Sequence, residues 1–142
     1  MHRRDTLQVP GRAEMRLKPG LRASRTLLAA IFVVAGVLHF AIPGAYERIM
    51  PPYLPLHRAL VLMSGALEIA GGVGLLVERT RRAAGVGLAA LLLAVWPANL
   101  QMVLNARAAG APAWWEALLW ARLPAQLLLV AWAWRVSRPA RA

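Results

Sequence analysis

Hydrophobic residues are grouped along this chain into four long runs, each close to the length that crosses a membrane. The runs predict transmembrane helices over residues 25–42, 57–77, 83–104 and 115–134. A helix rises about 1.5 Å per residue, so about 20 residues cross the hydrocarbon core of a bilayer. The pattern therefore predicts an all-α protein, an integral membrane four-helix bundle.

Basic residues lie in the segments that join and flank these runs. Residues 1–24 are expected to form a flexible basic tail and residues 139–142 a C-terminal tail, on either side of a membrane domain over residues 25–138. The loop at residues 78–82 and both ends are rich in arginine, whereas the other two loops are poor in it. Loops rich in Lys and Arg stay in the cytoplasm, so both termini are predicted to be cytoplasmic.

Two stretches that contain proline interrupt the pattern of long apolar runs. Between the first and second runs, the sequence PGAYERIMPPYLPLHR predicts a short interfacial element at headgroup depth, where tyrosines are common. Within the third run, Pro97 follows Trp96. A proline at that depth leaves a backbone carbonyl without its helical partner, so a kink is expected unless a neighbouring helix satisfies the carbonyl.

Composition supports the membrane class and decides how the charge is interpreted. The chain of 142 residues is 59% hydrophobic and 16% charged, which is too apolar for an ordinary soluble domain. The formal net charge of +11 would by itself suggest nucleic-acid binding. The basic residues, however, flank the apolar runs, where they contact anionic headgroups. We therefore expect the lipid bilayer to be the partner, and no nucleic acid.

Several kinds of chemistry are excluded by residues that the chain lacks. It contains no cysteine, so by itself it cannot carry out thiol–disulfide exchange, hold an iron–sulfur cluster or build a Cys-ligated zinc site. A redox role would need a bound cofactor or a partner protein. The three histidines, His2, His39 and His57, lack the spacing of metal ligands, and no dinucleotide-binding or P-loop pattern is present. No metal site is expected.

One carboxylate, Glu68, lies near the middle of the second run, LMSGALEIAGGVGLL. A carboxylate at the centre of a bilayer costs about 3 kcal/mol, so such groups turn towards other helices and find polar partners. The other runs carry polar side chains at comparable depth. The candidate site consists of His39, Ser64, Glu68, Asn99, Arg122 and Gln126.

Arg122 is the expected partner of Glu68, because a guanidinium group matches the geometry of a carboxylate. Gly65, Gly71 and Gly74 on the second run would let neighbouring helices approach closely. Two interpretations of the polar residues stay open: a binding pocket in the outer half of the membrane, or a network that only fixes helix register. For the histidine of the first run, proton handling and an interfacial hydrogen bond are equally open.

The segments that hold these residues resemble the DoxX-like family of small four-helix membrane proteins. The resemblance covers residues 35–134 and rests on AGVLHFAIP, PPYLP, SGALEIAGGVGLL, TRRAAGVGLAALLLAVWPANLQM and ARLPAQLLLVAWAW, in that order. It implies a four-helix bundle in a bacterial cytoplasmic membrane, in a family whose members are linked to sulfur-compound oxidation and quinone reduction. The positions that match the family's polar pattern are His39, Pro43, Glu68, Pro97, Asn99, Arg122, Pro124 and Gln126.

Three functions are compatible with the sequence. The first is a membrane subunit or binding module of a redox system, which holds a quinone-like ligand near Glu68 and Arg122 while a redox partner protein transfers electrons. The second is a stand-alone proton-coupled carrier or membrane enzyme in which Glu68 or His39 exchanges protons. The third is a membrane scaffold without a ligand. The sequence does not decide between an enzyme and a binding protein.

Overall fold

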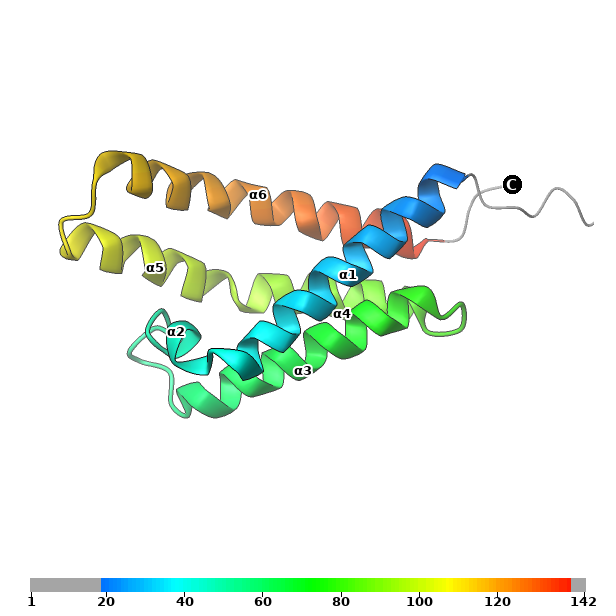
Figure 1. Ribbon diagram of the computed structural model, residues 1–142, viewed down its shortest axis with the longest axis horizontal. Coiled ribbons are helices and arrows are strands. Elements are labelled where there is room, and N and C mark those ends of the chain that lie inside the picture. The colour runs from blue at the N-terminus through cyan, green and yellow to red at the C-terminus, as the bar shows by residue number, and fades with distance from the viewer. Residues whose placement is uncertain (1–18, 139–142) are drawn as a thin grey trace, which may run out of the picture.

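The structure, a computed structural model, describes residues 19–138, and this part of the chain contains six α-helices joined by short connections (Figure 1). They are α1 (Pro19–Ala41), α2 (Pro43–Glu47), α3 (His57–Leu76), α4 (Arg81–Ala94), α5 (Trp96–Ala108) and α6 (Ala113–Ser137). The predicted all-α class is confirmed. The short helix α2 lies in the segment for which an interfacial element was predicted.

Four helical segments are long and apolar enough to cross a membrane: Gly20–Ala41, His57–Leu76, Arg81–Ala108 and Ala113–Ser137. The shortest has 20 residues, which corresponds to about 30 Å of helix. Their outer faces carry large apolar side chains, for example Leu128 with an exposed fraction of 73%. Soluble proteins rarely expose contiguous apolar surface of this extent. These helices indicate a multi-pass membrane protein.

The first helix extends into the segment that the sequence assigns to a flexible tail. Residues from Pro19 onward are helical, whereas residues 1–18 and the predicted C-terminal tail at 139–142 lie outside the described residues. Contacts with α6 explain the extension: Trp132 Nε1 donates a hydrogen bond to Ser24 Oγ at 2.7 Å, and Arg25 is buried. Tertiary packing therefore favours helix in a stretch that local sequence predicts to be flexible.

The third span is broken at Val95, between α4 and α5. Pro97 lies in the first turn of α5, where its missing N–H cannot bond to a carbonyl of the preceding turn. An interruption thus occurs where the sequence predicts a kink: a single residue, Val95, separates α4 from α5 within the candidate span Arg81–Ala108.

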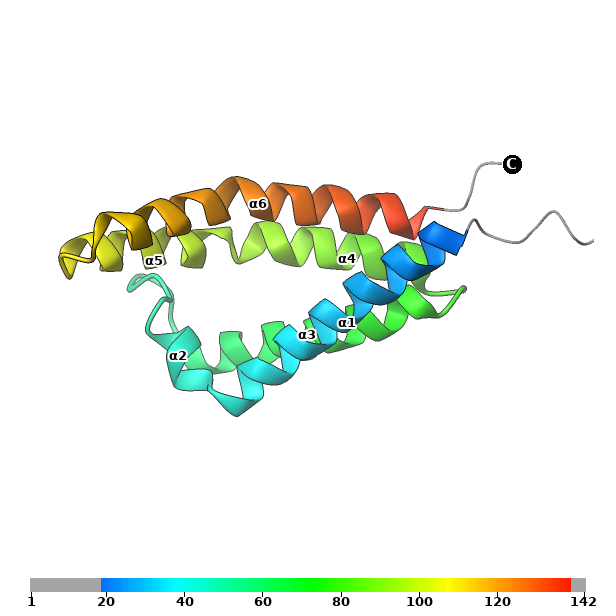
Figure 2. The ribbon, with the colours of Figure 1, turned by 45° about the horizontal axis from the view of Figure 1, so that its top comes forward.

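The helices form two groups that meet at one end of the molecule and diverge at the other (Figure 2). In one group α1 packs along α3, and in the other α4 and α5 pack along α6, while α3 and α4 contact each other. The start of α1, the α3–α4 connection and the end of α6 lie together at the closed end. Helix α2 and the α5–α6 connection lie at the wide end.

The hydrophobic core is divided in the same way. One cluster joins α1, α3, α4 and α6 towards the closed end, and its buried members are Leu28, Ala29, Phe32, Leu75, Leu88, Leu92, Ala133 and Val136. A second cluster, formed by Val103, Leu119 and Leu123, joins only α5 and α6. Because the second cluster does not include α1 or α3, the two groups of helices are free to separate at the wide end.

Helices α1 and α3 touch backbone to backbone. A Cβ atom added at Gly65 would lie 2.6 Å from His39 Cβ and 2.9 Å from the Gly36 carbonyl oxygen. Any larger residue at Gly65 or Gly36 would therefore push the helices apart. Gly71 and Gly74 lie against side chains of the neighbouring helix, Leu88 and Ala84 of α4, so the close packing that the sequence predicted for these glycines is confirmed.

The substitution Gly65→Ala is expected to lower the free energy of unfolding by about 1–3 kcal/mol, because the added methyl group overpacks the α1–α3 contact. The measurement is the thermal unfolding midpoint of the purified protein in a neutral detergent. Gly87→Ala is the matched control, since a Cβ at Gly87 meets nothing within 4 Å and alanine favours a helix. Equal midpoints for the two variants would contradict the proposed tight contact.

Candidate functional site

A cavity of about 410 Å³ lies between the two groups of helices. Its lining is mainly apolar, with side chains such as Ile31, Phe32 and Leu129. The polar side chains that line it include all six candidates from the sequence: His39, Ser64, Glu68, Asn99, Arg122 and Gln126. The structure thus brings residues of α1, α3, α5 and α6 to one space.

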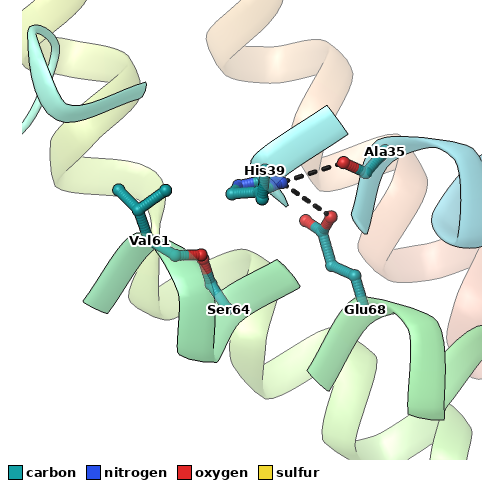
Figure 3. Close-up of polar contacts among 5 residues, drawn as sticks. All are labelled: Ala35, His39, Val61, Ser64 and Glu68. Atoms are coloured by element: carbon teal, nitrogen blue, oxygen red, sulfur yellow. Dashed lines mark hydrogen bonds and ion pairs between the residues drawn. The ribbon is translucent and has the colours of Figure 1, made fainter. Parts of the chain in front are cut away.

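One wall of the cavity is formed by His39 of α1 and Glu68 of α3 (Figure 3). His39 Nδ1 lies 2.9 Å from the Ala35 carbonyl oxygen and 3.4 Å from Glu68 Oε2. A carbonyl oxygen can only accept a hydrogen bond, so Nδ1 carries the proton, and in the neutral ring Nε2 is an acceptor. Both residues are buried, each with an exposed fraction of 8%.

The Glu68 carboxylate has an incomplete set of partners. Its Oε2 atom is buried, and among residues 19–138 no group donates a hydrogen bond to it. The neighbouring Ser64 hydroxyl donates instead to the Val61 carbonyl oxygen at 2.9 Å (Figure 3). A buried polar atom without a partner is unfavourable. Glu68 would be stabilised by a proton or by a hydrogen-bond donor from a bound molecule.

The predicted ion pair between Glu68 and Arg122 is wrong. In the described part of the chain Glu68 is paired with His39, whereas Arg122 Nε donates a hydrogen bond to Asn99 Oδ1 at 3.2 Å. The reason is the arrangement of the helices: α3 packs on α1 and α4, and α6 packs on α4 and α5. The cavity therefore separates the two charges, which both line it.

The opposite wall is a chain of hydrogen bonds that runs from Arg122 to the break in the third span. Arg122 donates to Asn99, Asn99 Nδ2 donates to Gln126 Oε1, and Gln126 Nε2 donates to the Leu92 carbonyl oxygen. Carbonyl groups in the last turn of a helix lack intrahelical partners, and Leu92 lies in the last turn of α4, which ends at Ala94. A side chain of α6 thus satisfies a backbone group at the break.

Tyr46 of α2 is a further polar residue at the cavity. Its ring stacks on the His39 ring, with a centroid separation of 3.8 Å and an interplanar angle of 22°. Burial raises the pKa of the Tyr46 hydroxyl above its ordinary value, the negative charge of Glu68 raises it further, and the positive charge of Arg122 acts in the opposite direction. The hydroxyl therefore stays protonated at neutral pH and can donate a hydrogen bond.

Tyr46 is not among the site residues that the sequence predicts. Tyrosine is common in interfacial segments of membrane proteins, so its occurrence in PGAYERIM has an ordinary explanation. Only the fold of α2 back over the end of α1 places this ring beside His39 (Figure 2).

The hydrogen-bond donors and acceptors that line the cavity suit an organic ligand that carries a few polar groups. Within residues 19–138 no group of three or more His, Cys, Asp or Glu residues could hold a metal ion. The cavity instead presents an imidazole, a carboxylate, a phenol, two amides and a guanidinium on a mainly apolar surface. Such a surface can orient the polar groups of a molecule whose body is apolar.

The cavity lies within the part of the chain that matches a known family. A family model described as "Domain of unknown function (DUF8561)" matches residues 28–137. The chain belongs to this family. The match includes every residue that lines the cavity in the DUF8561 protein. No curated protein and no solved structure matches the chain.

Replacing Gln126 with leucine is expected to destabilise the protein by about 1–2 kcal/mol, because the Leu92 carbonyl and the Asn99 amide would lose their partners. The thermal midpoint in neutral detergent measures the effect. Gln101→Leu is the matched control, since Gln101 bonds only to Asn105 at the exposed surface in the described residues. If both variants unfold at the same temperature, the hydrogen-bond chain does not stabilise the break.

Proposed function

We propose that this DUF8561 protein is an integral membrane binding module that holds a small amphipathic, quinone-like ligand and acts as a membrane subunit of a redox system. The observation that supports this best is the convergence of polar side chains from four helices on a mainly apolar cavity of about 410 Å³. Ligand sites are typically apolar spaces with a few oriented polar groups. The resemblance of the sequence to DoxX-like proteins makes a quinone the first ligand to test.

The polar groups suit both redox forms of a quinone. The carbonyl oxygens of the oxidised form accept hydrogen bonds, and Tyr46 and Arg122 are donors at the cavity. The hydroxyl groups of the reduced form can donate to the Glu68 carboxylate, whose partners are incomplete. The chain contains no cysteine, so electrons would reach the ligand from a redox partner protein.

We further propose that the protein lies in a bacterial cytoplasmic membrane with both termini in the cytoplasm. The closed end of the bundle, where the described chain begins and ends, carries most of the arginines of the described segments. Arginine-rich ends favour the cytoplasmic side. In this orientation the wide end of the molecule, with α2, faces the outer surface, and the cavity lies in the outer half of the membrane.

A short-chain ubiquinone analogue is expected to raise the thermal midpoint of the purified protein, because a ligand that binds only the folded state stabilises it. The substitutions Glu68→Gln and Arg122→Gln should each weaken the apparent affinity about tenfold or more. A hydrogen bond to a charged group contributes about 1.5–3 kcal/mol, which corresponds to such a change. The measurement is the midpoint as a function of ligand concentration in neutral detergent.

Two matched controls use the ion pair between Arg107 and Glu116. This pair, at 3.6 Å, is not part of the cavity lining, so Arg107→Gln and Glu116→Gln should bind the analogue like the wild type. A wild-type protein that does not respond, or four variants that respond like the wild type, would contradict the proposal. Either result would favour the scaffold, in which the polar network only fixes helix packing.

A second function, a proton-coupled carrier or membrane enzyme that acts alone, is favoured by one contact. His39 and Glu68 are two titratable groups 3.4 Å apart at the cavity. A histidine next to a carboxylate can exchange protons near neutral pH. Such a function needs no redox partner, so transport or turnover by the purified protein distinguishes it from the binding module.

For this carrier, proteoliposomes that contain the wild-type protein should show a proton flux that changes over about pH 5–8, the range in which histidine titrates. The flux should be lost in Glu68→Gln and kept in Glu116→Gln, whose carboxylate lies outside the cavity lining. A pH-sensitive dye inside the vesicles measures the flux. Wild-type vesicles no more permeable than protein-free vesicles would exclude the carrier.

A further inference from the structure

Segments rich in arginine meet at the closed end of the bundle, where the described chain begins and ends (Figure 1). The first turns of α1, the α3–α4 connection with the start of α4, and the end of α6 lie together there. We call the following residues the terminal arginine cluster: Arg22, Arg25, Arg79, Arg81, Arg82 and Arg138. In the described part of the chain these segments contribute a single carboxylate, that of Glu78.

Two members of the cluster are held in place by carbonyl groups at helix ends. Arg25 Nε donates to the Val136 carbonyl oxygen in the last turn of α6 at 3.2 Å. Arg81 Nε donates to the Leu75 carbonyl oxygen in the last turn of α3 at 3.3 Å. Positive charge is favourable at helix C-termini. These contacts hold two guanidinium groups of the closed end in place, that of the buried Arg25 and that of the partly exposed Arg81.

The charges of the cluster are not balanced within the described residues. Arg22 and Arg81 lie close enough to Arg25 to repel it, and Glu78 attracts it more weakly. Arg25 is buried, with an exposed fraction of 4%. Its Nη2 atom has no hydrogen-bond partner among residues 19–138. A set of like charges at close range is unfavourable unless an anion offsets the repulsion.

The opposite, wide end of the bundle differs in the partners of its arginines. There, Arg58 pairs with Glu47 at 3.4 Å, and Arg107 pairs with Glu116 at 3.6 Å. Two arginines of the wide end, Arg58 and Arg107, thus have carboxylates of the chain itself as partners, whereas the terminal arginine cluster has a surplus of positive charge within the described residues.

We propose that the terminal arginine cluster binds the phosphate group of an anionic phospholipid. The exposed side chains of Arg22 and Arg82 would contact the phosphate, and Arg25 adds its charge from beneath. The cluster lies at the end of four spans, at the depth of lipid headgroups. Trp134, whose ring lies 4.9 Å from the Arg138 guanidinium carbon, is typical of the membrane–water interface. A lipid phosphate reaches this depth in every bilayer.

The test compares soluble short-chain lipids added to the full-length protein in neutral detergent at low salt. Dioctanoyl phosphatidylglycerol is expected to raise the thermal midpoint, whereas dioctanoyl phosphatidylcholine, which carries no net charge, is not. In the double variant Arg22→Gln/Arg82→Gln the apparent affinity for phosphatidylglycerol should fall about fivefold for each arginine removed. Added NaCl should weaken the effect, since salt screens exposed charges.

The matched control is the double variant Arg48→Gln/Arg107→Gln, which has the same net charge but changes arginines at the wide end. It should respond to phosphatidylglycerol like the wild type. An equal loss in both double variants, or an equal response to phosphatidylcholine, would overturn the proposal. Inorganic phosphate at matched ionic strength provides a further arm: a rise in midpoint as large as that caused by the lipid would show a site for free anions and overturn the lipid assignment.

Discussion

The backbone contact between α1 and α3 at Gly36 and Gly65 is the interaction on which the rest of the structure depends. Inside a bilayer there is no hydrophobic force between helices, so close packing and hydrogen bonds must hold them together. At this contact the absence of side chains lets the two backbones touch, which brings His39 within 3.4 Å of Glu68. A wider spacing would separate the imidazole from the carboxylate and remove one wall of the cavity.

The break in the third span determines the other wall. Because α4 ends before Pro97, the Leu92 carbonyl needs a partner from another helix, and Gln126 provides it. Gln126 and Asn99 are therefore part of a chain of hydrogen bonds that also includes Arg122. The two walls therefore differ in chemistry: one has a carboxylate oxygen to which no group of residues 19–138 donates a hydrogen bond, and the other has hydrogen-bond donors and a positive charge. Because the cavity lies between them, these charges do not neutralise each other by direct contact, and a molecule in the cavity can interact with both.

The closed and wide ends of the bundle have different electrostatic roles. At the wide end two arginines, Arg58 and Arg107, have carboxylate partners in the chain, which offsets part of the positive charge there. At the closed end helix packing brings together arginines from three segments that are far apart in the sequence. Their surplus charge lies where a membrane surface is expected, and it favours one orientation of the protein in the bilayer. The same arrangement supports both the proposed topology and the proposed lipid site.

The sequence by itself determined the class of the protein, the approximate positions of four spans and the polar residues worth attention. A chain that crosses lipid must form its backbone hydrogen bonds within the helix, so each span is visible in the sequence as one long apolar run. An ionisable residue such as Glu68 is easy to recognise within such a run. Only the tertiary structure decided which polar groups touch. Spacing along a helix predicts depth, but rotation and divergence of the helices depend on close contacts such as that at Gly65. For this reason Glu68 faces His39 and not Arg122, and Tyr46 joins the cavity from a segment that sequence pattern assigns to the interface.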